Sequence, residues 1–372
     1  MILTVDTEQT TWTKGNPFDQ RNYNVCISWK TTDGEDEGGV IFAEDRGQFE
    51  PIYKRADLVV GFNLKYDLHW LKKLYDYIPE RIWDCQLCEF LLGRQSPAYP
   101  SLDSTAKKYE IGSKSGAVEE YWNNGVNTND IPREVLAEYA LKDAELTYKI
   151  YLRQRELLHQ TRLFSLMCQD LLVLQEMEWN GIKIDEELAE QKAQELDNKI
   201  AEIQTKLSLY HNVPGFNWAS TDHLSALLYG GTIKQKVKEP AGFFKTGPKV
   251  GHPKFKWVLR EYHLPRIYKP VRNSELKKEG YWSVEEQTLR KLRGDNALIE
   301  GILEIKGMEK QISTYLRGFP KKRRESFWNP GMIHSNLNQC VTITGRLSSS
   351  GPNCQNLPLE NIGDIFPTRF GT

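Results

Sequence analysis

The chain has 372 residues, a formal net charge of −1 and 39% hydrophobic residues. That length exceeds what a single hydrophobic core comfortably supports, so two or three domains are expected. The composition excludes long disorder, and the absence of an apolar run of about 18 residues argues against a membrane-spanning helix. We expect a folded, cytoplasmic protein.

The near-neutral total hides an uneven distribution of charge. Residues 1–160 contain 26 acidic and 19 basic residues, whereas residues 234–278 contain 13 basic residues and three glutamates. Clustered positive charge suits a polyanionic partner, and aromatic residues alternate with the lysines as they do in base-stacking surfaces. We predict that 231–280 is an irregular or β-rich insertion that contacts nucleic acid or a protein partner. The alternative is a solvated loop.

The first 160 residues alternate strand-like and helical patterns, which predicts an α/β fold. Predicted strands cover 2–5, 25–29, 40–42 and 58–61, and predicted helices cover 67–75 and 132–155. The Gly- and Asp-rich stretch 33–39 is typical of a hairpin loop between two strands. Cys85 and Cys88 have a metal-like spacing, but no second pair lies nearby, so a buried helix is favoured over a zinc site.

From about residue 163 the pattern changes to long helices, which predicts a second domain. Predicted helices cover 186–210 and 297–319. The pair Asn180-Gly181 indicates a turn, and Ser220 or Thr221 can cap a further helix that runs through Tyr229.

Three short polar motifs carry the chemistry of the first domain. Asp6 and Glu8 lie two residues apart at the end of the first predicted strand, so both project to one face of it. Asp67 opens a predicted helix four residues after Asn63. A carboxylate cluster suits Mg²⁺, although the Asp6 and Glu8 pair alone is weak evidence and would be explained better by two solvated acids.

The third motif consists of Tyr139 and Asp143, which share one helix face because they are four residues apart. In this order, D-x-E, N-x-x-x-D and Y-x-x-x-D resemble the tyrosine-bearing branch of the DEDD exonuclease superfamily. The resemblance implies an RNase H-like mixed sheet with flanking helices, and hydrolysis of a phosphodiester at a 3′ terminus with two Mg²⁺ or Mn²⁺ ions. The implied metal ligands are Asp6, Glu8, Asp67 and Asp143. Tyr139 would orient the nucleophile, and Asn63 would either bind the substrate strand or support Asp67.

The segment from Thr344 to Pro358, TGRLSSSGPNCQNLP, resembles the entry to the palm of family A DNA polymerases. Segments 178–182, 216–220 and 305–315 resemble the thumb of that family. The resemblance implies three parts: an exonuclease domain at 1–160, a helical thumb at 161–330 and the start of a palm at 331–372. The implied DNA contacts are Arg346, Asn353, Gln355 and Asn356. The alternative for the serine-rich segment is a turn with structural polar groups.

The resemblance implies a proofreading 3′→5′ DNA exonuclease at the front of a family A polymerase of phage-like type. Because the sequence ends before the first catalytic aspartate of the family, we expect a split or truncated polymerase whose palm and fingers belong to a second polypeptide. We expect no polymerase activity from this chain alone. A processivity partner at 231–280 is a looser analogy. Two alternatives remain: a DNA-binding or assembly subunit without catalysis, and an exoribonuclease of the RNase D type.

Overall fold

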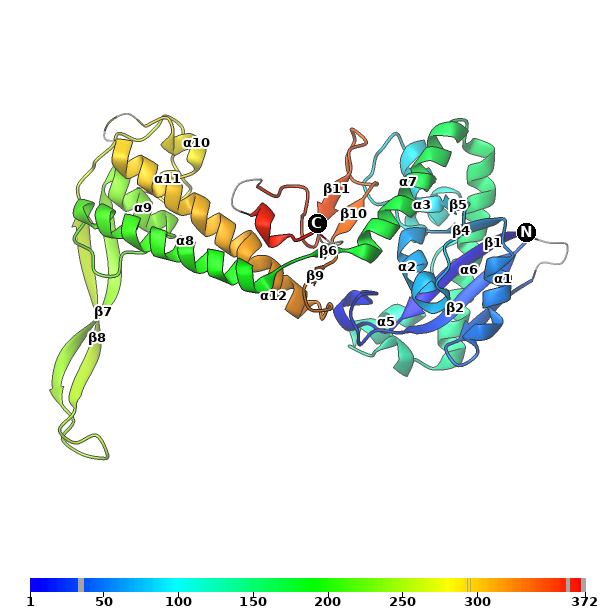
Figure 1. The fold of residues 1–372 in the computed structure, drawn as a ribbon, viewed down its shortest axis with the longest axis horizontal. Coiled ribbons are helices and arrows are strands. Elements are labelled where there is room, and N and C mark those ends of the chain that lie inside the picture. The colour runs from blue at the N-terminus through cyan, green and yellow to red at the C-terminus, as the bar shows by residue number, and fades with distance from the viewer. Residues whose placement is uncertain (33–36, 293, 295, 359–361, 369–372) are drawn as a thin grey trace. The chain divides into compact units, whose positions relative to one another are not determined.

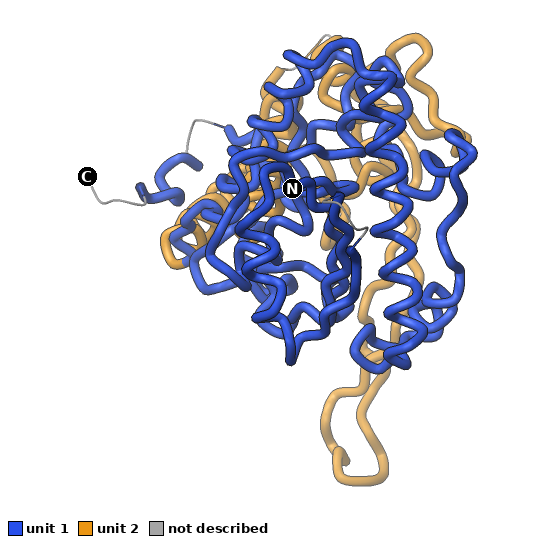
Figure 2. Tube along the Cα trace, turned by 90° about the vertical axis from the view of Figure 1, so that its right-hand side faces the viewer, with its two compact units in different colours: residues 1–186, 319–372 blue, residues 187–318 orange. Residues whose placement is uncertain are grey.

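The computed structural model describes residues 1–372 except 33–36, 293, 295, 359–361 and 369–372. It divides into two compact units, one of residues 1–186 with 319–372 and one of residues 187–318 (Figure 2). The chain therefore leaves the first unit after residue 186 and returns to it at residue 319. Contacts group residues 161–186 with the residues before them, whereas the functional boundaries at 160 and 330 stay a prediction.

The first unit is built on a five-stranded mixed sheet (Figure 1). Its strands are β1 (Ile2–Gln9), β2 (Asn24–Thr31), β3 (Gly38–Phe42), β4 (Leu58–Gly61) and β5 (Ile82–Asp84), in the order β3-β2-β1-β4-β5. β1 pairs antiparallel with β2 and parallel with β4, which confirms the predicted α/β class. β2 and β3 form the predicted hairpin, but residues 33–36 of its loop lie outside the described part of the chain.

Helices cover both faces of this sheet. They are α1 (Glu50–Lys54), α2 (Leu64–Tyr75), α3 (Cys85–Leu92), α4 (Leu102–Lys108), α5 (Ala117–Asn123), α6 (Arg133–Leu157) and α7 (Thr161–Asn180). One apolar cluster joins the sheet to α2, α3 and α7, and two others include residues of α6. Cys85 and Cys88 are both buried in α3, as the sequence favoured.

Strand β1 is longer than the sequence suggested. The apolar run ends at Val5, but pairing with β2 continues through Asp6, Thr7 and Glu8, so the acids lie inside the strand. Its alternation turns Leu3 and Val5 into the apolar core and Asp6 and Glu8 to the opposite face. That opposite face packs against α6, which carries the third motif.

Helix α7 ends where the sequence indicated a turn. Gly181 has φ +65°, and a Cβ there would lie 2.9 Å from the His334 ring and from the Ile333 carbonyl oxygen. The close approach brings β6 (Ile182–Lys183) against β9 (Met332–Ile333). A second small ladder pairs β10 (Asn336–Asn338) with β11 (Ser348–Ser350), so the predicted palm entry is part of the first unit.

The second unit combines helices with one long β-hairpin. Its elements include α8 (Glu186–Leu207), α9 (Thr221–Tyr229), α10 (Glu286–Leu289), α11 (Asn296–Gln311), β7 (Gly231–Phe243) and β8 (Pro253–Leu264). The Ser220 side chain accepts from the His223 amide and caps α9, as predicted. The 231–280 insertion thus begins as a regular two-stranded ribbon rather than an irregular loop.

The single helix predicted over 297–319 is wrong. Helix α11 ends at Gln311, a π-helical turn follows over Ile312–Leu316, and α12 (Gly318–Glu325) begins afterwards. Pro320 explains the break, because its ring would clash with the carbonyl of Leu316 in a continuous helix. Within the described residues, no helix is both long and apolar enough to cross a bilayer.

Candidate functional site

Three predicted carboxylates converge between β1 and α6. One oxygen from each of Asp6, Glu8 and Asp143 lies within 4.8 Å of the others, the one such acidic group found among the described residues. Asp143 is buried, and its Oδ1 has no hydrogen-bond partner. A buried carboxylate oxygen without a hydrogen-bond donor is costly, so this atom is suited to bind a cation.

The cluster holds several carboxylates close together in a site that is buried from water. Burial, followed by the charge of Asp143, raises the pKa of Asp6 to about 7. Burial and the neighbouring acids also raise the pKa of Glu8, and burial raises that of Asp143 although Lys114 acts against it. Oxygen donors at this spacing suit a hard divalent cation, which would relieve the repulsion.

Lys114 supplies the positive charge nearest to the cluster, and sequence reasoning missed it. Its Nζ lies 2.5 Å from Asp143 Oδ2 and 5.1 Å from the centre of the Tyr139 ring. The Lys114 amide donates to Asp103 Oδ1, which ties the loop that carries it to α4. Lys114 belongs to no motif and reaches the site only through the fold, so no local pattern indicates its role.

Asp67 lines the same pocket but stands outside the three-carboxylate group. Its Oδ1 accepts from the Thr7 amide at 3.1 Å and the Thr7 hydroxyl at 2.6 Å. Gln9 in turn donates to the Thr7 hydroxyl. Thr7, between the two acids of β1, thus fixes the carboxylate of α2 beside the strand.

Asn63 occupies the sharp turn between β4 and α2. It has φ +61°, a left-handed conformation that asparagine tolerates better than most residues. The Leu64 amide that follows donates to the buried carboxylate of Asp84, which also caps α3 through the Leu87 amide. Asp84 therefore supports the turn that presents Asn63 and Asp67, a role the sequence analysis did not assign.

The carboxylates open into a pocket of about 380 Å³. A second pocket of about 450 Å³ shares Lys14, Asn63 and Tyr66 with it, so the two adjoin. The second pocket also contains Lys65 and Lys322, and residues of β10 line its far side. A polar, partly basic surface thus runs from the carboxylates to the predicted palm entry.

Comparisons with known proteins match the two ends of the chain separately. Residues 3–158 match the 3′-5′ exonuclease family, and residues 259–365 match DNA polymerase family A. The chain is therefore similar to family A DNA polymerases toward its C-terminal end and to their 3′-5′ exonuclease domain in its first 158 residues.

The relatives are bacterial DNA polymerases I. That of Bacillus subtilis is 28% identical over 269 residues, which are 71% of this chain and 26% of the relative. That of Borreliella burgdorferi is 23% identical over 371 residues, which are 96% of this chain and 35% of the relative. The chain therefore spans about a quarter to a third of the length of these family A enzymes.

One solved structure shows that the fold is shared. It is the POL domain of Pol1 from M. smegmatis in complex with DNA primer-template and dNTP, with a TM-score of 0.66 and 17% identity. The match covers 98% of this chain and 54% of that structure. At this identity the likeness carries the fold of the family A enzyme and nothing more.

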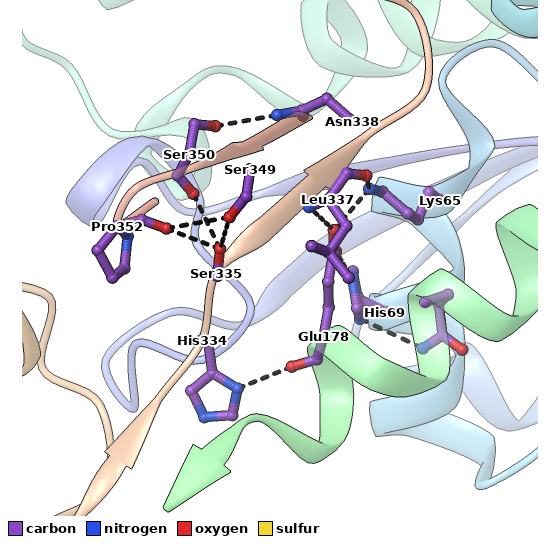
Figure 3. Close-up of polar contacts among 11 residues, drawn as sticks. Lys65, His69, Glu178, His334, Ser335, Leu337, Asn338, Ser349, Ser350 and Pro352 are labelled. Carbon is purple, nitrogen blue, oxygen red and sulfur yellow. Dashed lines mark hydrogen bonds and ion pairs between the residues drawn. The ribbon is translucent and has the colours of Figure 1, made fainter. Parts of the chain in front are cut away.

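The matched exonuclease domain and the predicted palm entry meet at a buried charged network (Figure 3). Glu178 of α7 is 3% exposed at its side chain and accepts from Lys65 Nζ at 2.6 Å, His69 Nε2 at 2.8 Å and the Leu337 amide at 2.5 Å. His334 donates from Nδ1 to the Glu178 carbonyl oxygen. Helix α2, helix α7 and strand β10 are thereby joined at one carboxylate.

His69 is built into this network as a neutral ring. Nε2–H donates to Glu178, and Nδ1 accepts from the Gln175 amide at 3.2 Å. Burial lowers the pKa of His69 from its ordinary 6.5. The hydrogen bond that His69 donates to Glu178 opposes this shift, and the charges of Lys65 and Lys72 add to it. Burial alone would raise the pKa of Glu178, but the His69 hydrogen bond and the Lys65 charge hold it below its ordinary value.

We expect His69 to make the first unit less stable as the pH falls below 6.5. The unfolded chain then binds a proton that the folded ring excludes, so stability is complete above 6.5 and declines toward the lowered folded pKa. Amide exchange of α2 and α7 in wild type and His69→Gln, between about pH 5 and 8, isolates this contribution as a difference. An equal pH slope in both proteins would refute it.

The four predicted DNA contacts lie in the predicted palm entry. Arg346, Asn353, Gln355 and Asn356 are all exposed, and Asn353 Oδ1 accepts from the Gln355 amide. The serine-rich segment between Arg346 and Asn353 is anchored to the fold, because the buried Ser335 hydroxyl bonds to that of Ser349. The structure therefore displays the four polar side chains on a fixed segment, apart from the three-carboxylate group.

Proposed function

We propose that this chain hydrolyses DNA from the 3′ end as a metal-dependent exonuclease that proofreads for a family A polymerase. The observation that carries the proposal is the convergence of Asp6, Glu8 and Asp143 on one pocket within the matched exonuclease domain. The orphaned Asp143 oxygen and the crowded charges favour a divalent cation there.

Asp6, Glu8 and Asp143 would hold Mg²⁺ or Mn²⁺ directly. Asp67 would contribute to a second ion through water, since Thr7 already engages one of its oxygens. Bound ions would supply a water of lowered pKa and positive charge for the phosphate being cleaved. The protein's own task is to hold the four acids together in one pocket.

Tyr139 and Lys114 are the donors beside the carboxylates. Burial, followed by the charges of Glu8 and Asp143, raises the pKa of Tyr139, so its hydroxyl stays protonated beside the carboxylates and can orient the nucleophile. Lys114 pairs with Asp143 in the free enzyme and lies within reach of an arriving phosphate. Both side chains would fix Asp143 and the substrate rather than take part in bond breaking.

We expect Lys114→Met to lower kcat/KM on single-stranded DNA about 10- to 100-fold, the usual effect of removing a partner of a metal ligand. The fold should survive, because aliphatic bulk is retained. Steady-state hydrolysis at saturating Mg²⁺ measures the loss. Lys149→Met, an exposed lysine on α6, is the matched control. Equal rates in the two variants would show that Lys114 has no role in hydrolysis.

The substrate strand would run along the adjoining pockets. Asn63, Lys14 and Tyr66 line both, so they would contact the nucleotides next to the scissile bond. Arg346, Asn353, Gln355 and Asn356 would hold the primer-template, because their side chains can bridge sugars and minor-groove edges without strong sequence choice. The separate palm-and-fingers polypeptide, the processivity partner, the phage-like origin and the cytoplasmic location stay predictions.

A 5′-labelled single-stranded DNA oligonucleotide tests the proposal directly. The chain should produce a ladder that shortens from the 3′ end with Mg²⁺ or Mn²⁺ and stops with chelator, and Asp6→Ala should produce none. Binding without shortening would favour a DNA-binding subunit. Faster cleavage of the matched RNA would favour an RNase D-like exoribonuclease.

A further inference from the structure

The β7–β8 hairpin carries an apolar row that the second unit does not cover. Trp257, Leu259 and Phe255 are 67%, 57% and 48% exposed. They alternate along β8, so all three project from the same face of the ribbon. Scattered apolar residues are ordinary on a surface, but three large ones in line mark a contact surface.

The same face carries a row of lysines on the neighbouring strand. Lys234, Lys236 and Lys238 pair across the ladder with Glu261, Leu259 and Trp257. The Lys238 ammonium lies 5.4 Å from the centre of the Phe255 ring and 6.0 Å from that of Trp257. A line of positive charge therefore runs beside a line of rings, with Glu261 as the one acid of the face, toward its base.

The opposite face of the ribbon differs. Ile233 is buried against the unit, and Val237 and Val258 pair with each other and are half-buried. Arg260 is neutralised there by Glu239. The strands leave α9 and extend away from the helices of their own unit (Figure 1). The apolar residues of the Lys/aromatic face are therefore not explained by packing within this unit.

We propose that this Lys/aromatic face, formed by Lys234, Lys236, Lys238, Phe255, Trp257 and Leu259, binds single-stranded nucleic acid. Residues 231–264 contain eight basic residues and two glutamates, a charge that suits a polyanion. Alternating aromatic rings can stack on the successive bases of a single strand. In a duplex the bases stack on one another and are not available to the rings. The lysine row follows the phosphates alongside.

The affinity of the full chain for a fluorescent oligo(dT) in chelator tests the proposal, because no hydrolysis occurs there. Trp257→Ala should weaken binding about 5- to 100-fold, and Trp257→Phe should restore most of it. Lys236→Gln with Lys238→Gln should flatten the slope of log affinity against log salt by about 1.4. The control variant Lys254→Gln with Lys256→Gln removes two positive charges from β8, outside the Lys/aromatic face. It should weaken binding less than the β7 double variant does.

Photo-crosslinking locates the contact independently of affinity. An oligonucleotide with 5-iodouracil should crosslink to the peptide that contains Phe255 and Trp257. Absence of that crosslink, with affinities of Trp257→Ala and wild type within about twofold, would overturn the proposal and leave the face to a protein partner. Because the hairpin variants keep all the site carboxylates, hydrolysis of a trinucleotide should be unchanged in them. The binding and crosslinking results therefore test the hairpin face even if the chain proves to have no exonuclease activity.

Discussion

Replacing Asp143 with asparagine should abolish metal-dependent hydrolysis while the chain stays folded. The substitution keeps the size of the side chain but removes a charged oxygen donor from the group formed with Asp6 and Glu8. Hard divalent ions bind ionised carboxylates far better than amides, so the loss should exceed the roughly 100-fold upper range seen for outer-shell partners. Steady-state kcat/KM on labelled single-stranded DNA, over a range of Mg²⁺ concentrations, measures it.

Folding should tolerate this change because Asp143 lies among like charges. Lys114 would lose one partner but keep the attraction of Asp6 and Glu8. Glu145→Gln is the matched control, since Glu145 is an exposed acid on the same helix. The control should retain full activity. Hydrolysis by Asp143→Asn at the rate of Glu145→Gln would exclude the proposed metal site.

The sequence predicted that Asp6, Glu8 and Asp143 lie close together, because the signal for this grouping is local. A two-residue spacing on a strand and a four-residue spacing on a helix each fix two side chains on one face, whatever surrounds them. Only the docking of α6 on β1 was needed to bring Asp6, Glu8 and Asp143 together, and the motif order implied it. The roles of these residues still rest on the kinetic tests.

Features that depend on long-range contacts could not be predicted from the sequence. Lys114, Asp84 and Glu178 each act on segments that lie elsewhere in the chain, and none stands in a periodic pattern. The extension of β1 through Glu8 depends on pairing with β2, which local propensity does not report. The break before Pro320 was readable, by contrast, because a proline inside a helical pattern is a local stop signal.

Replacing Glu178 with glutamine should destabilise the first unit by about 3 kcal/mol, within the range for breaking a buried ion pair. The carboxylate accepts from Lys65, His69 and the Leu337 amide, and it is 3% exposed. A neutral amide would turn one N–H group toward these donors and leave the Lys65 ammonium without its counter-charge. Hydrogen exchange of α2 and α7 amides would report the loss locally, which suits a chain with two compact units.

Glu176→Gln provides the comparison, because Glu176 lies two residues earlier on α7 and pairs with Lys72 at the surface. Its side chain is 50% exposed, so the change should cost less than about 1 kcal/mol. The His69 ring can switch tautomer and the Gln175 amide can turn its unbonded Oε1 toward it, which would soften the Glu178 effect. Neither adjustment supplies a negative charge for Lys65. Equal protection in the two variants would mean that hydrophobic packing, rather than this carboxylate, holds the palm-entry strand to the exonuclease fold.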